Sequence, residues 1–459
     1  MKIALVRPNY KSHIITPPIG LGYLSSYLKK SGIETKIIDG LKENLSPSRL
    51  MRRILKFNPD AVGITCLTAF YQEVVVLARE LAKNKITTVI GGQHPTFLPY
   101  RTLLESQADF VVCGEGEIPL LELAESKFCN KSIRGVYSLE NLKSEQQEII
   151  KASVVDNLDD LPFPDWEQID PREYPRAPHG AVVRGFPVGV MVTSRGCPFE
   201  CTFCAAPRFC DRTIRFRTPE NVVAEIDYLM KNFNISEVHF EDDNFTLNAD
   251  NVKKFCRLLI EKNIKIHWAC PNGVRADHIS EDLIVLMKQS GCYYIAYGIE
   301  SVNSSILEKI KKRESVETIQ RAIDMTGKAG ISTQGFFIFG LPGETAASME
   351  DNIRFALRSG LSRAQFVILD VLPGSELWDS LRGKFTPNWS KESFRQPEYL
   401  PEGMTKEQLM QAQSRAFRKF YLRPRILFRL LSLMHYRQIF YLLRRLKAYR
   451  ILGWNGGKE

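Results

Sequence analysis

The sequence VGVMVTSRGCPFECTFC, residues 188–204, decides the fold of this chain. Its first half is a short apolar run rich in valine, which predicts a buried strand. Its second half places Cys197, Cys201 and Cys204 on one loop in a CxxxCxxC spacing. Three thiolates at this spacing can bind three irons of a [4Fe–4S] cluster and leave the fourth iron open to a ligand that is not protein.

A zinc site is the alternative interpretation of these cysteines. Structural zinc usually takes four ligands in two pairs, and the nearby Cys210 and His179 do not repeat such a spacing. The sequence therefore favours a cluster over zinc. The cysteines outside the triplet are scattered, and we interpret them as packing residues: Cys66, Cys113, Cys129, Cys210, Cys256, Cys270 and Cys292.

Strand-like and helix-like segments alternate downstream of the cysteine loop. The predicted helices cover residues 218–232, 249–262, 276–291, 315–329 and 346–359. The predicted strands are VGVMVTS, EVHFED, KIHWAC, YYIAYGIE, STQGFFIFG and AQFVILDVLP. Six such units predict a partial (βα)6 barrel of the TIM type, with its chemistry at the carboxyl ends of the strands.

A second βα series precedes the barrel. Its predicted strands are KIALVRP, TKIID, AVGITCL, TTVIGG and FVVCGEGE, and they alternate with helices as in a doubly wound, Rossmann-like α/β domain. The loops after these strands are candidate ligand sites because glycines let a backbone approach a large ligand. Tight turns are the alternative role for the same glycines. The loops are Pro17–Leu21, Thr65–Thr68, Gly91–Thr96 and Gly114–Glu117.

The chain of 459 residues is longer than one hydrophobic core usually supports. We predict a Rossmann-like domain over residues 1–130, a proline-rich linker over 131–180, the barrel over 181–375 and a helical, basic region over 376–459.

With these residues in view, the chain resembles the radical S-adenosylmethionine superfamily, whose signature is CxxxCφC with an aromatic φ, here Phe203. The resemblance implies that the open iron binds S-adenosylmethionine and that one electron cleaves it to methionine and a 5′-deoxyadenosyl radical. Further segments match the nucleotide-binding positions of the family. In FEDDNF, Glu241, Asp242 and Asp243 are candidates for the amino group or ribose.

Two more segments extend this match. Glu300 in YGIES stands at a usual ribose position, and GFFIFGLPGET supplies Gly340 to Glu344 near adenine. Helix capping is the alternative role for the acidic residues.

The first domain resembles the cobalamin-binding domain of the cobalamin-dependent branch of this superfamily, which includes enzymes similar to hopanoid methylases. The resemblance rests on PPIGLGYL, GGQHPT, DFVVCGEGE and a PGSEL segment that ends the barrel. The DxHxxG motif that supplies a cobalt ligand is absent, so the lower ligand is unassigned and His94 is expected to contact the corrin or its tail. The implied cobalamin-binding residues are Pro18, Gly20, Leu21, Thr65, Gly92, His94, Gly114 and Glu115.

The resemblance implies methylation of an unactivated carbon of a lipid or other small molecule, through the 5′-deoxyadenosyl radical and methylcobalamin. An electron donor such as flavodoxin or ferredoxin is implied as a partner. Ring formation or oxidative cyclisation, as in magnesium-protoporphyrin cyclases, is the alternative with the same cofactors. An inactive cobalamin-binding sensor or scaffold is a third hypothesis, which the intact triplet disfavours. A transfer-RNA methylthiotransferase is disfavoured because the N-terminal cysteines are dispersed. No catalytic residue is assigned.

The net charge of +10 is concentrated near the C-terminus, where Gln408–Leu452 contains eleven Lys and Arg residues and no acidic residue. Aromatic and aliphatic residues between the arginines suit either peripheral contact with anionic lipid or a helical cap on the barrel. Nucleic acid is not expected, because no recognition motif accompanies the charge. Without a signal peptide or an uninterrupted apolar span, a cytoplasmic location is expected, with contact at the inner membrane face as an option.

Overall fold

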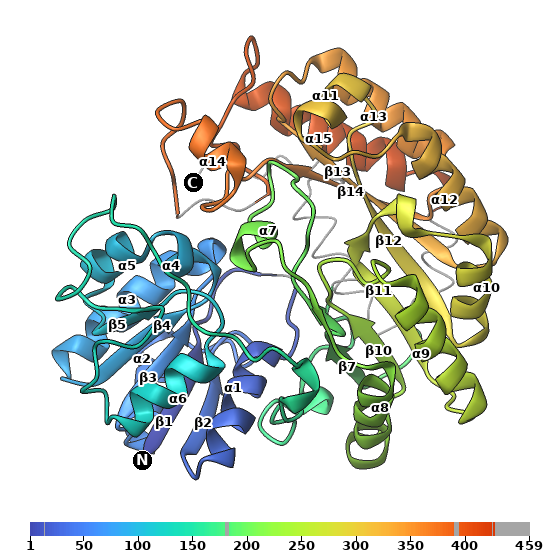
Figure 1. The fold of residues 1–459 in the computed structure, drawn as a ribbon. Helices are drawn as coiled ribbons and strands as arrows, with labels where there is room; N and C mark the ends of the chain where they lie inside the picture. Colours follow the sequence, from blue (N-terminus) through green and yellow to red (C-terminus); the bar gives the residue numbers. More distant parts are fainter. Residues whose placement is uncertain (13, 180–182, 390–393, 425, 427–459) are drawn as a thin grey trace.

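The computed structural model describes all residues except 13, 180–182, 390–393, 425 and 427–459. Two α/β units stand side by side, and segments after the barrel return to the first unit (Figure 1). Every strand predicted from an apolar run is present, and so are the helices predicted between them.

The first unit is a six-stranded sheet in the order β2-β1-β3-β4-β5-β6. All neighbouring strands are parallel except β5 and β6. The order reverses between β1 and β3, which is where open α/β sheets bind ligands. The strands are β1 (Lys2–Arg7), β2 (Glu34–Asp39), β3 (Ala61–Thr65), β4 (Thr87–Gly91), β5 (Phe110–Val112) and β6 (Val136–Tyr137).

Helices cover both faces of this sheet because its strands are apolar on both sides. In β1, Ile3 and Leu5 pack with α1 and α6, whereas Ala4 and Val6 pack with α2, α3 and α5. This two-sided core confirms the predicted Rossmann-like fold. The helices are α1 (Ile19–Lys30), α2 (Pro47–Phe57), α3 (Tyr71–Lys83), α4 (Gln93–Phe97), α5 (Pro99–Ser106) and α6 (Glu117–Glu125).

The second unit is a curved sheet of six parallel strands in the order β14-β13-β12-β11-β10-β7. Its edge strands β14 and β7 do not pair with each other, so the barrel is partial, as predicted. The strands are β7 (Val188–Met191), β10 (Glu237–Phe240), β11 (His267–Val274), β12 (Cys292–Glu300), β13 (Ser332–Phe339) and β14 (Arg363–Ile368). A short antiparallel ribbon, β8 (Ser194–Arg195) and β9 (Arg215–Phe216), flanks the cysteine loop.

Helices cover the outside of the barrel sheet (Figure 1). They pack their apolar faces onto it, as Val222 and Ile226 of α8 do. These helices are α8 (Pro219–Phe233), α9 (Ala249–Glu261), α10 (Glu281–Gln289), α11 (Ser304–Lys309), α12 (Val316–Lys328) and α13 (Ala346–Arg358). The short α7 (Ala206–Phe209) follows the cysteine triplet.

The predicted linker is built into both units. It supplies strand β6 to the first sheet, and Trp166 and Ile169 lie in the same apolar core as residues of α1 and α8. A Cβ on Gly22 of α1 would lie 2.7 Å from Ile169 and 2.8 Å from Pro164, so only glycine lets this segment approach the helix.

The region after the barrel divides into two parts. Helix α14 (Glu376–Ser380) leads to Trp389, which packs edge-on against His94 of the first unit at 5.0 Å between ring centroids. Helix α15 (Lys406–Tyr421) packs against β14 and α13, with Leu409 and Phe417 buried in the core. This part of the basic region is therefore a cap on the barrel. The remaining basic residues from 427 onward lie outside the described residues. Among the described residues, no helix is long and apolar enough to cross a membrane.

Candidate active site

The cysteine loop begins where β7 ends and is held by backbone contacts from two directions. Gly196 has φ of +106°, and a Cβ there would lie 2.1 Å from the Thr213 carbonyl oxygen, so the turn requires glycine. The Thr202 N–H donates to the Ile310 carbonyl at 3.0 Å, and the Thr202 carbonyl accepts from Leu377 N at 2.8 Å. Backbone groups of Ile310 and Leu377 therefore hold the loop in place.

Cys197, Cys201 and Cys204 lie together on this loop, each partly exposed. Burial raises the pKa of all three thiols, that of Cys204 to about 12. Within the described residues, no three His, Cys, Asp or Glu side chains converge on a single ion position. Three sulfur donors on one loop in this spacing suit three irons of a [4Fe–4S] cluster.

Aromatic residues line the same loop. Phe203, between the last two cysteines, packs against the apolar cluster that contains Ile306, Ile310 and Leu341. The guanidinium of Arg275 lies 3.9 Å from the centre of the Phe199 ring. These contacts place the loop against the segments that follow β11, β12 and β13.

The three consecutive acids after β10 point to three different partners. Asp242 is buried and accepts hydrogen bonds from Thr193 N at 3.0 Å, Thr193 Oγ1 at 2.7 Å and Ser194 Oγ at 2.6 Å. It therefore orients the chain leading to the cysteines. Asp243 faces the cysteine loop, and burial together with Asp242 raises its pKa to about 6.

Glu241 points elsewhere, to a histidine of the linker. Its Oε1 lies 2.6 Å from His179 Nε2.

Glu300 ends β12 in a strained backbone conformation, with φ of +64°. Its carboxylate lies over Gly298, where a Cβ would come within 2.6 Å of Glu300 Oε1 and 3.0 Å of Lys312 Nζ. The buried Lys312 ammonium is 3.5 Å from Glu300 and 3.3 Å from Glu314. Burial raises the pKa of Glu300, while Lys312 opposes this rise.

Lys312 and Arg275 carry positive charge to this edge. Burial acts to lower the pKa of Lys312, but Glu300 and Glu314 raise it above its ordinary value. Arg275 is buried and paired with Asp277 at 2.7 Å. Neither cation was predicted from the sequence, because no motif marks them; their position after β11 and α11 becomes informative only once the fold is known.

The segment after β13 forms a turn around a buried carboxyl. Glu344 Oε2 accepts hydrogen bonds from Gly340 N at 2.5 Å and Leu341 N at 3.3 Å, and Glu344 is 1% exposed. Burial raises its pKa to about 8. Gly340 has φ of +92°, which the turn requires. Glu344 therefore shapes the turn through its backbone contacts.

In the first unit, the loops after β3, β4 and β5 are joined to one another. A Cβ on Gly92 would lie 2.5 Å from the Cys66 carbonyl oxygen, so the loop after β4 lies directly on the loop that follows Thr65. Thr96 Oγ1 donates to the Gly92 carbonyl at 2.7 Å and accepts from Gly114 N at 2.9 Å. Glycines and one threonine thus join the three loops at this edge of the sheet.

His94 lies beneath this surface and is completely buried. Its ring stacks on Tyr71 at 4.0 Å between centroids, and its Nδ1 is 3.1 Å from Thr68 Oγ1. Burial lowers its pKa to about 3, so the imidazole is neutral.

The residues predicted on the loop after β1 have different environments. Gly20 is exposed near the start of α1 with no atom within 4 Å of a Cβ position, and Pro18 is partly exposed before it. Leu21 is 4% exposed and packs in the core. Gly20 and Pro18 are thus accessible at the sheet edge, whereas Leu21 supports the helix from inside.

Glu115 joins the two units. Its carboxylate pairs with Arg195 at 2.6 Å and with Arg215, both from the ribbon that flanks the cysteine loop. Arg195 also pairs with Glu117 at 2.8 Å. Since Arg195 stands two residues before Cys197, this partly buried network connects the loop after β5 to the cysteine loop.

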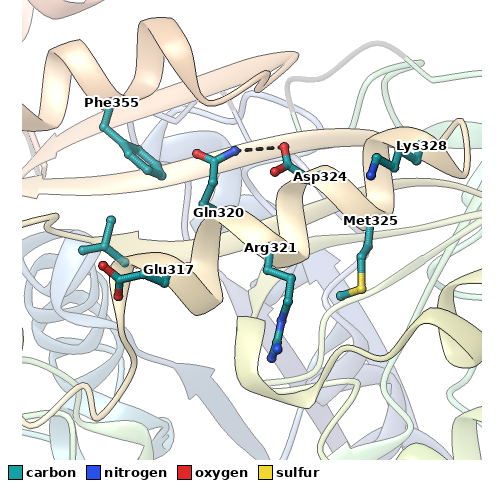
Figure 2. Close-up of a pocket in the computed structure, with 8 residues that line it drawn as sticks. Glu317, Gln320, Arg321, Asp324, Met325, Lys328 and Phe355 are labelled. Atoms are coloured by element: carbon teal, nitrogen blue, oxygen red, sulfur yellow. Dashed lines mark hydrogen bonds between the residues drawn. The ribbon is translucent and has the colours of Figure 1, made fainter.

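A groove of 510 Å³ lies on the outer side of the barrel (Figure 2). Its lining comes mostly from α12, and Gln320 donates a hydrogen bond to Asp324 at 2.9 Å. Glu317, Arg321, Asp324 and Lys328 are exposed and of mixed charge. The groove lies outside the sheet and takes no residue of the cysteine loop, so we do not assign it to the active site.

Two family models match the chain. The B12 binding domain matches residues 10–124, and the Radical SAM superfamily matches residues 191–356. An uncharacterized methyltransferase of Pyrococcus horikoshii is 33% identical over 443 residues, which cover 93% of this chain and 94% of the relative. The chain belongs to the cobalamin-dependent radical S-adenosylmethionine enzymes.

Two further relatives indicate the range of this enzyme family. A cytidylyl-2-hydroxyethylphosphonate methyltransferase of Streptomyces wedmorensis is 30% identical, and the alignment covers 79% of this chain and 77% of the relative. An anaerobic magnesium-protoporphyrin IX monomethyl ester cyclase of Rubrivivax gelatinosus is 28% identical and covers 92% of this chain and 78% of its own length.

The fold also matches a solved member of the radical S-adenosylmethionine enzymes, the methyltransferase TsrM from Kitasatospora setae. The TM-score is 0.69 at 19% identity, over 91% of this chain and 83% of that chain. The cofactors of the present chain are a [4Fe–4S] cluster, S-adenosylmethionine and cobalamin. The three thiols fit the [4Fe–4S] cluster, and the glycine-rich edge of the first sheet fits cobalamin.

Proposed function

We propose that this enzyme methylates an unactivated carbon of a small molecule. The observation that carries the proposal is the partly buried Glu115–Arg195 contact, which holds the loop after β5 of the cobalamin domain against the cysteine loop. Two cofactor sites joined in this way suit two reactions on one substrate. The extended similarity to two methyltransferases supports the same reaction.

We assign roles to the chain's own residues as part of this proposal. Cys197, Cys201 and Cys204 bind the cluster, and Phe203 keeps the loop packed against the barrel. Glu300, held over Gly298 and beside Lys312, binds the ribose of S-adenosylmethionine.

Further residues orient or surround these groups. Asp242 orients the strand end before the cysteines, and Asp243 faces the amino group of the cosubstrate. The turn from Gly340 to Glu344 lies against the adenine.

The first unit supplies a rigid surface for the corrin through Thr65, Gly92 and Gly114, with Pro18 and Gly20 at its rim. The cluster and cobalamin supply radical generation and methyl transfer, while the protein orients them and excludes water.

Oxidative cyclisation with the same cofactors is the second candidate function. Its support is the 28% identity to the magnesium-protoporphyrin cyclase over 92% of the chain. Product mass separates the two functions. Gain of one CH2 unit supports methylation, whereas loss of two hydrogens or gain of oxygen would refute it.

The experiment is an anaerobic incubation of the reconstituted enzyme with labelled S-adenosylmethionine, a strong reductant and a cell extract, followed by mass spectrometry of labelled products. A protein that forms no 5′-deoxyadenosine under these conditions would be a cobalamin-binding scaffold.

A lipid substrate and contact with an anionic membrane are the finer parts of this proposal, together with flavodoxin or ferredoxin as electron donor. The membrane hypothesis rests on the basic residues from 427 onward, since α15 is occupied by packing on the barrel. Truncation after residue 426 should reduce binding to anionic liposomes, and unchanged binding would remove this hypothesis.

A further inference from the structure

Four titratable side chains form a continuous hydrogen-bonded chain inside the barrel. Glu237 Oε1 lies 2.6 Å from His239 Nε2, and His239 Nδ1 lies 2.8 Å from His179 Nδ1. His179 Nε2 lies 2.6 Å from Glu241 Oε1. The chain therefore runs from the buried start of β10 to its carboxyl end, where the cysteine loop also lies.

The sequence alternation of β10 explains this placement. Val238 and Phe240 pack into the core beneath the helices, so Glu237 and His239 face the interior of the barrel. His179 comes from the linker, and the carbonyl of its neighbour Pro178 accepts a hydrogen bond from Ile15 N at 2.9 Å. Since Ile15 belongs to the loop after β1, His179 stands at the junction between the two units.

The number of available protons determines the protonation state of these four hydrogen-bonded side chains. Its three hydrogen bonds need three protons, whereas two carboxylates and two neutral imidazoles hold only two. With all bonds made, the chain therefore stores one additional proton. The question is where that proton resides.

The additional proton does not reside on Glu237, at the buried end of the hydrogen-bonded chain. Glu237 Oε2 accepts hydrogen bonds from Arg184 N at 2.7 Å and Gly185 N at 2.6 Å, and Oε1 accepts from the Tyr293 hydroxyl. Burial alone would raise the pKa of Glu237, but these donors and His239 lower it below its ordinary value. Glu237 is therefore ionised.

An ionised Glu237 fixes both imidazole tautomers. Burial lowers the pKa of His239, which is neutral and donates from Nε2 to Glu237. Its Nδ1 then accepts, so His179 must donate from Nδ1. The additional proton consequently lies between His179 Nε2 and Glu241 Oε1, at the edge where the cofactors meet. This is the orientation of a general base by a buried carboxylate.

Few other charges face this chain. Arg184 lies over the Tyr293 ring at 5.0 Å, and His267 packs edge-on against the same ring at 6.2 Å. Among the described residues, hydrogen bonds to the Glu241 side chain use only Oε1. Its second oxygen is therefore available for another partner, and Glu241 is partly exposed, with 24% of its side chain accessible.

We propose that His179 and Glu241 form an acid/base pair for a substrate O–H or N–H group beside the methylated carbon, with Glu237 and His239 as positioning residues. The O–H or N–H bond breaks, its proton moves to the second oxygen of Glu241, and the same proton returns after the new carbon–carbon bond has formed. The electron pair stays on the substrate oxygen or nitrogen throughout.

This inference rests on the proposed methylation, whose overall balance releases no proton. Two S-adenosylmethionine cations and two electrons from the reductant convert the substrate to its methylated product, 5′-deoxyadenosine, methionine and S-adenosylhomocysteine. Transfer of a substrate proton to Glu241 and back is therefore consistent with methylation. It assigns the substrate to molecules with an alcohol or amine group, so that a lipid substrate would have to carry such a group beside the methylated carbon. The barrel interior has the same character, because Tyr294 donates a hydrogen bond to Gln334 and Arg363 lies over the Tyr294 ring.

The first test needs no substrate. The chain has seven histidines, so nitrogen-15 histidine labelling of the full-length reconstituted enzyme gives a small NMR spectrum that His179→Gln and His239→Gln assign. We expect His239 to be protonated at Nε2 and His179 at Nδ1, and both tautomers to change in Glu237→Gln. Two histidines that titrate independently, with tautomers unaffected by Glu237→Gln, would overturn the proton chain.

The second test separates an acid/base role from a structural or cosubstrate-binding role. We expect His179→Gln and Glu241→Gln to lower the ratio of methylated product to 5′-deoxyadenosine by about 10²-fold or more, in the size range of general acid–base catalysis. Glu241→Asp should restore part of it, and the matched control His267→Gln should retain the ratio of the unsubstituted enzyme. An unchanged ratio with a raised KM for S-adenosylmethionine would make Glu241 a cosubstrate ligand and refute the inference.

The two proposals fail in different ways. If the unsubstituted enzyme gives no product with an added CH2 unit, the proposed methylation fails. If it gives that product and the His179 and Glu241 variants do so equally well, only the acid/base inference fails.

Discussion

At the carboxyl edge of the first sheet, the loops after β3, β4 and β5 carry glycines, a hydroxyl and a neutral, buried imidazole. At the carboxyl edge of the barrel, the corresponding loops carry thiols, carboxylates, a buried ammonium and a guanidinium. Both edges stand where parallel sheets bind ligands. The first edge offers shape to a cofactor that brings its own reactivity, whereas the second offers ligands and charges to groups that must be held and activated.

The largest expected effect comes from a substitution that disrupts the barrel edge alone. Cys201→Ala should reduce cleavage of S-adenosylmethionine below detection and lower the iron content, because the cluster loses one of three ligands. Cobalamin should stay bound, because the cobalamin domain contacts the cysteine-loop region through Glu115 and does not depend on Cys201. Iron analysis, 5′-deoxyadenosine assays and the cobalamin absorption spectrum measure these effects.

Cys256→Ala is the matched control, because Cys256 is buried in α9 and packs in the core. It should keep both cofactors. Loss of cobalamin from Cys201→Ala would show that the two edges are not independent.

The second prediction concerns charge at the barrel edge. In Gly298→Ala the added methyl group would displace the Glu300 carboxylate and the Lys312 ammonium, which both lie within 3.0 Å of its position. We expect a rise of about 10-fold in KM for S-adenosylmethionine, the size of one lost charged hydrogen bond. Gly327→Ala, which has no atom within 4 Å of its Cβ, is the control and should leave KM unchanged. An unchanged KM in Gly298→Ala would argue against Glu300 as a ribose ligand.

The contrast between the two edges also explains what the sequence predicts well. Apolar runs such as KIALVRP and AVGITCL identify strands, because a strand buried on both faces must be apolar throughout. The CxxxCφC spacing is equally visible, since all its members lie on one loop. The predicted loops of the first unit do lie together at one edge, although Leu21 packs inside the core.

Partners that are distant in sequence were not predictable. Glu115 meets Arg195 and Arg215 across the domain boundary, and nothing near either arginine marks the contact. The pairing of His179 with Glu241 spans the linker in the same way. One signal was present: Glu237 and His239 alternate in β10, and Glu241, directly after the strand, follows in the same alternation.

The third prediction tests the bridge between the edges. Glu115→Gln leaves Arg195 with Glu117 but leaves Arg215 without its carboxylate partner, at a cost of about 1–3 kcal/mol in the free energy of unfolding. We expect 5′-deoxyadenosine to form at the usual rate while methylated product falls several-fold, because the two units are less well aligned. Denaturant unfolding and the ratio of the two products provide the measurement. Glu122→Gln, in α6 and outside the network, is the control. Equal loss of both products would mean that Glu115 acts on stability alone.

The smallest expected effect concerns His94, whose environment distinguishes a shape-giving residue from a cobalt ligand. The ring is completely buried between Tyr71 and Trp389, so His94→Gln should cost about 0.5–1.5 kcal/mol of stacking. Because a buried, stacked imidazole cannot reach a ligand on the loops without leaving this packing, the absorption spectrum of bound cobalamin should be the same in the variant and the unsubstituted enzyme. A spectral change that accompanies retained binding would identify His94 as a cobalt ligand, and the first edge would then supply chemistry as the barrel edge does.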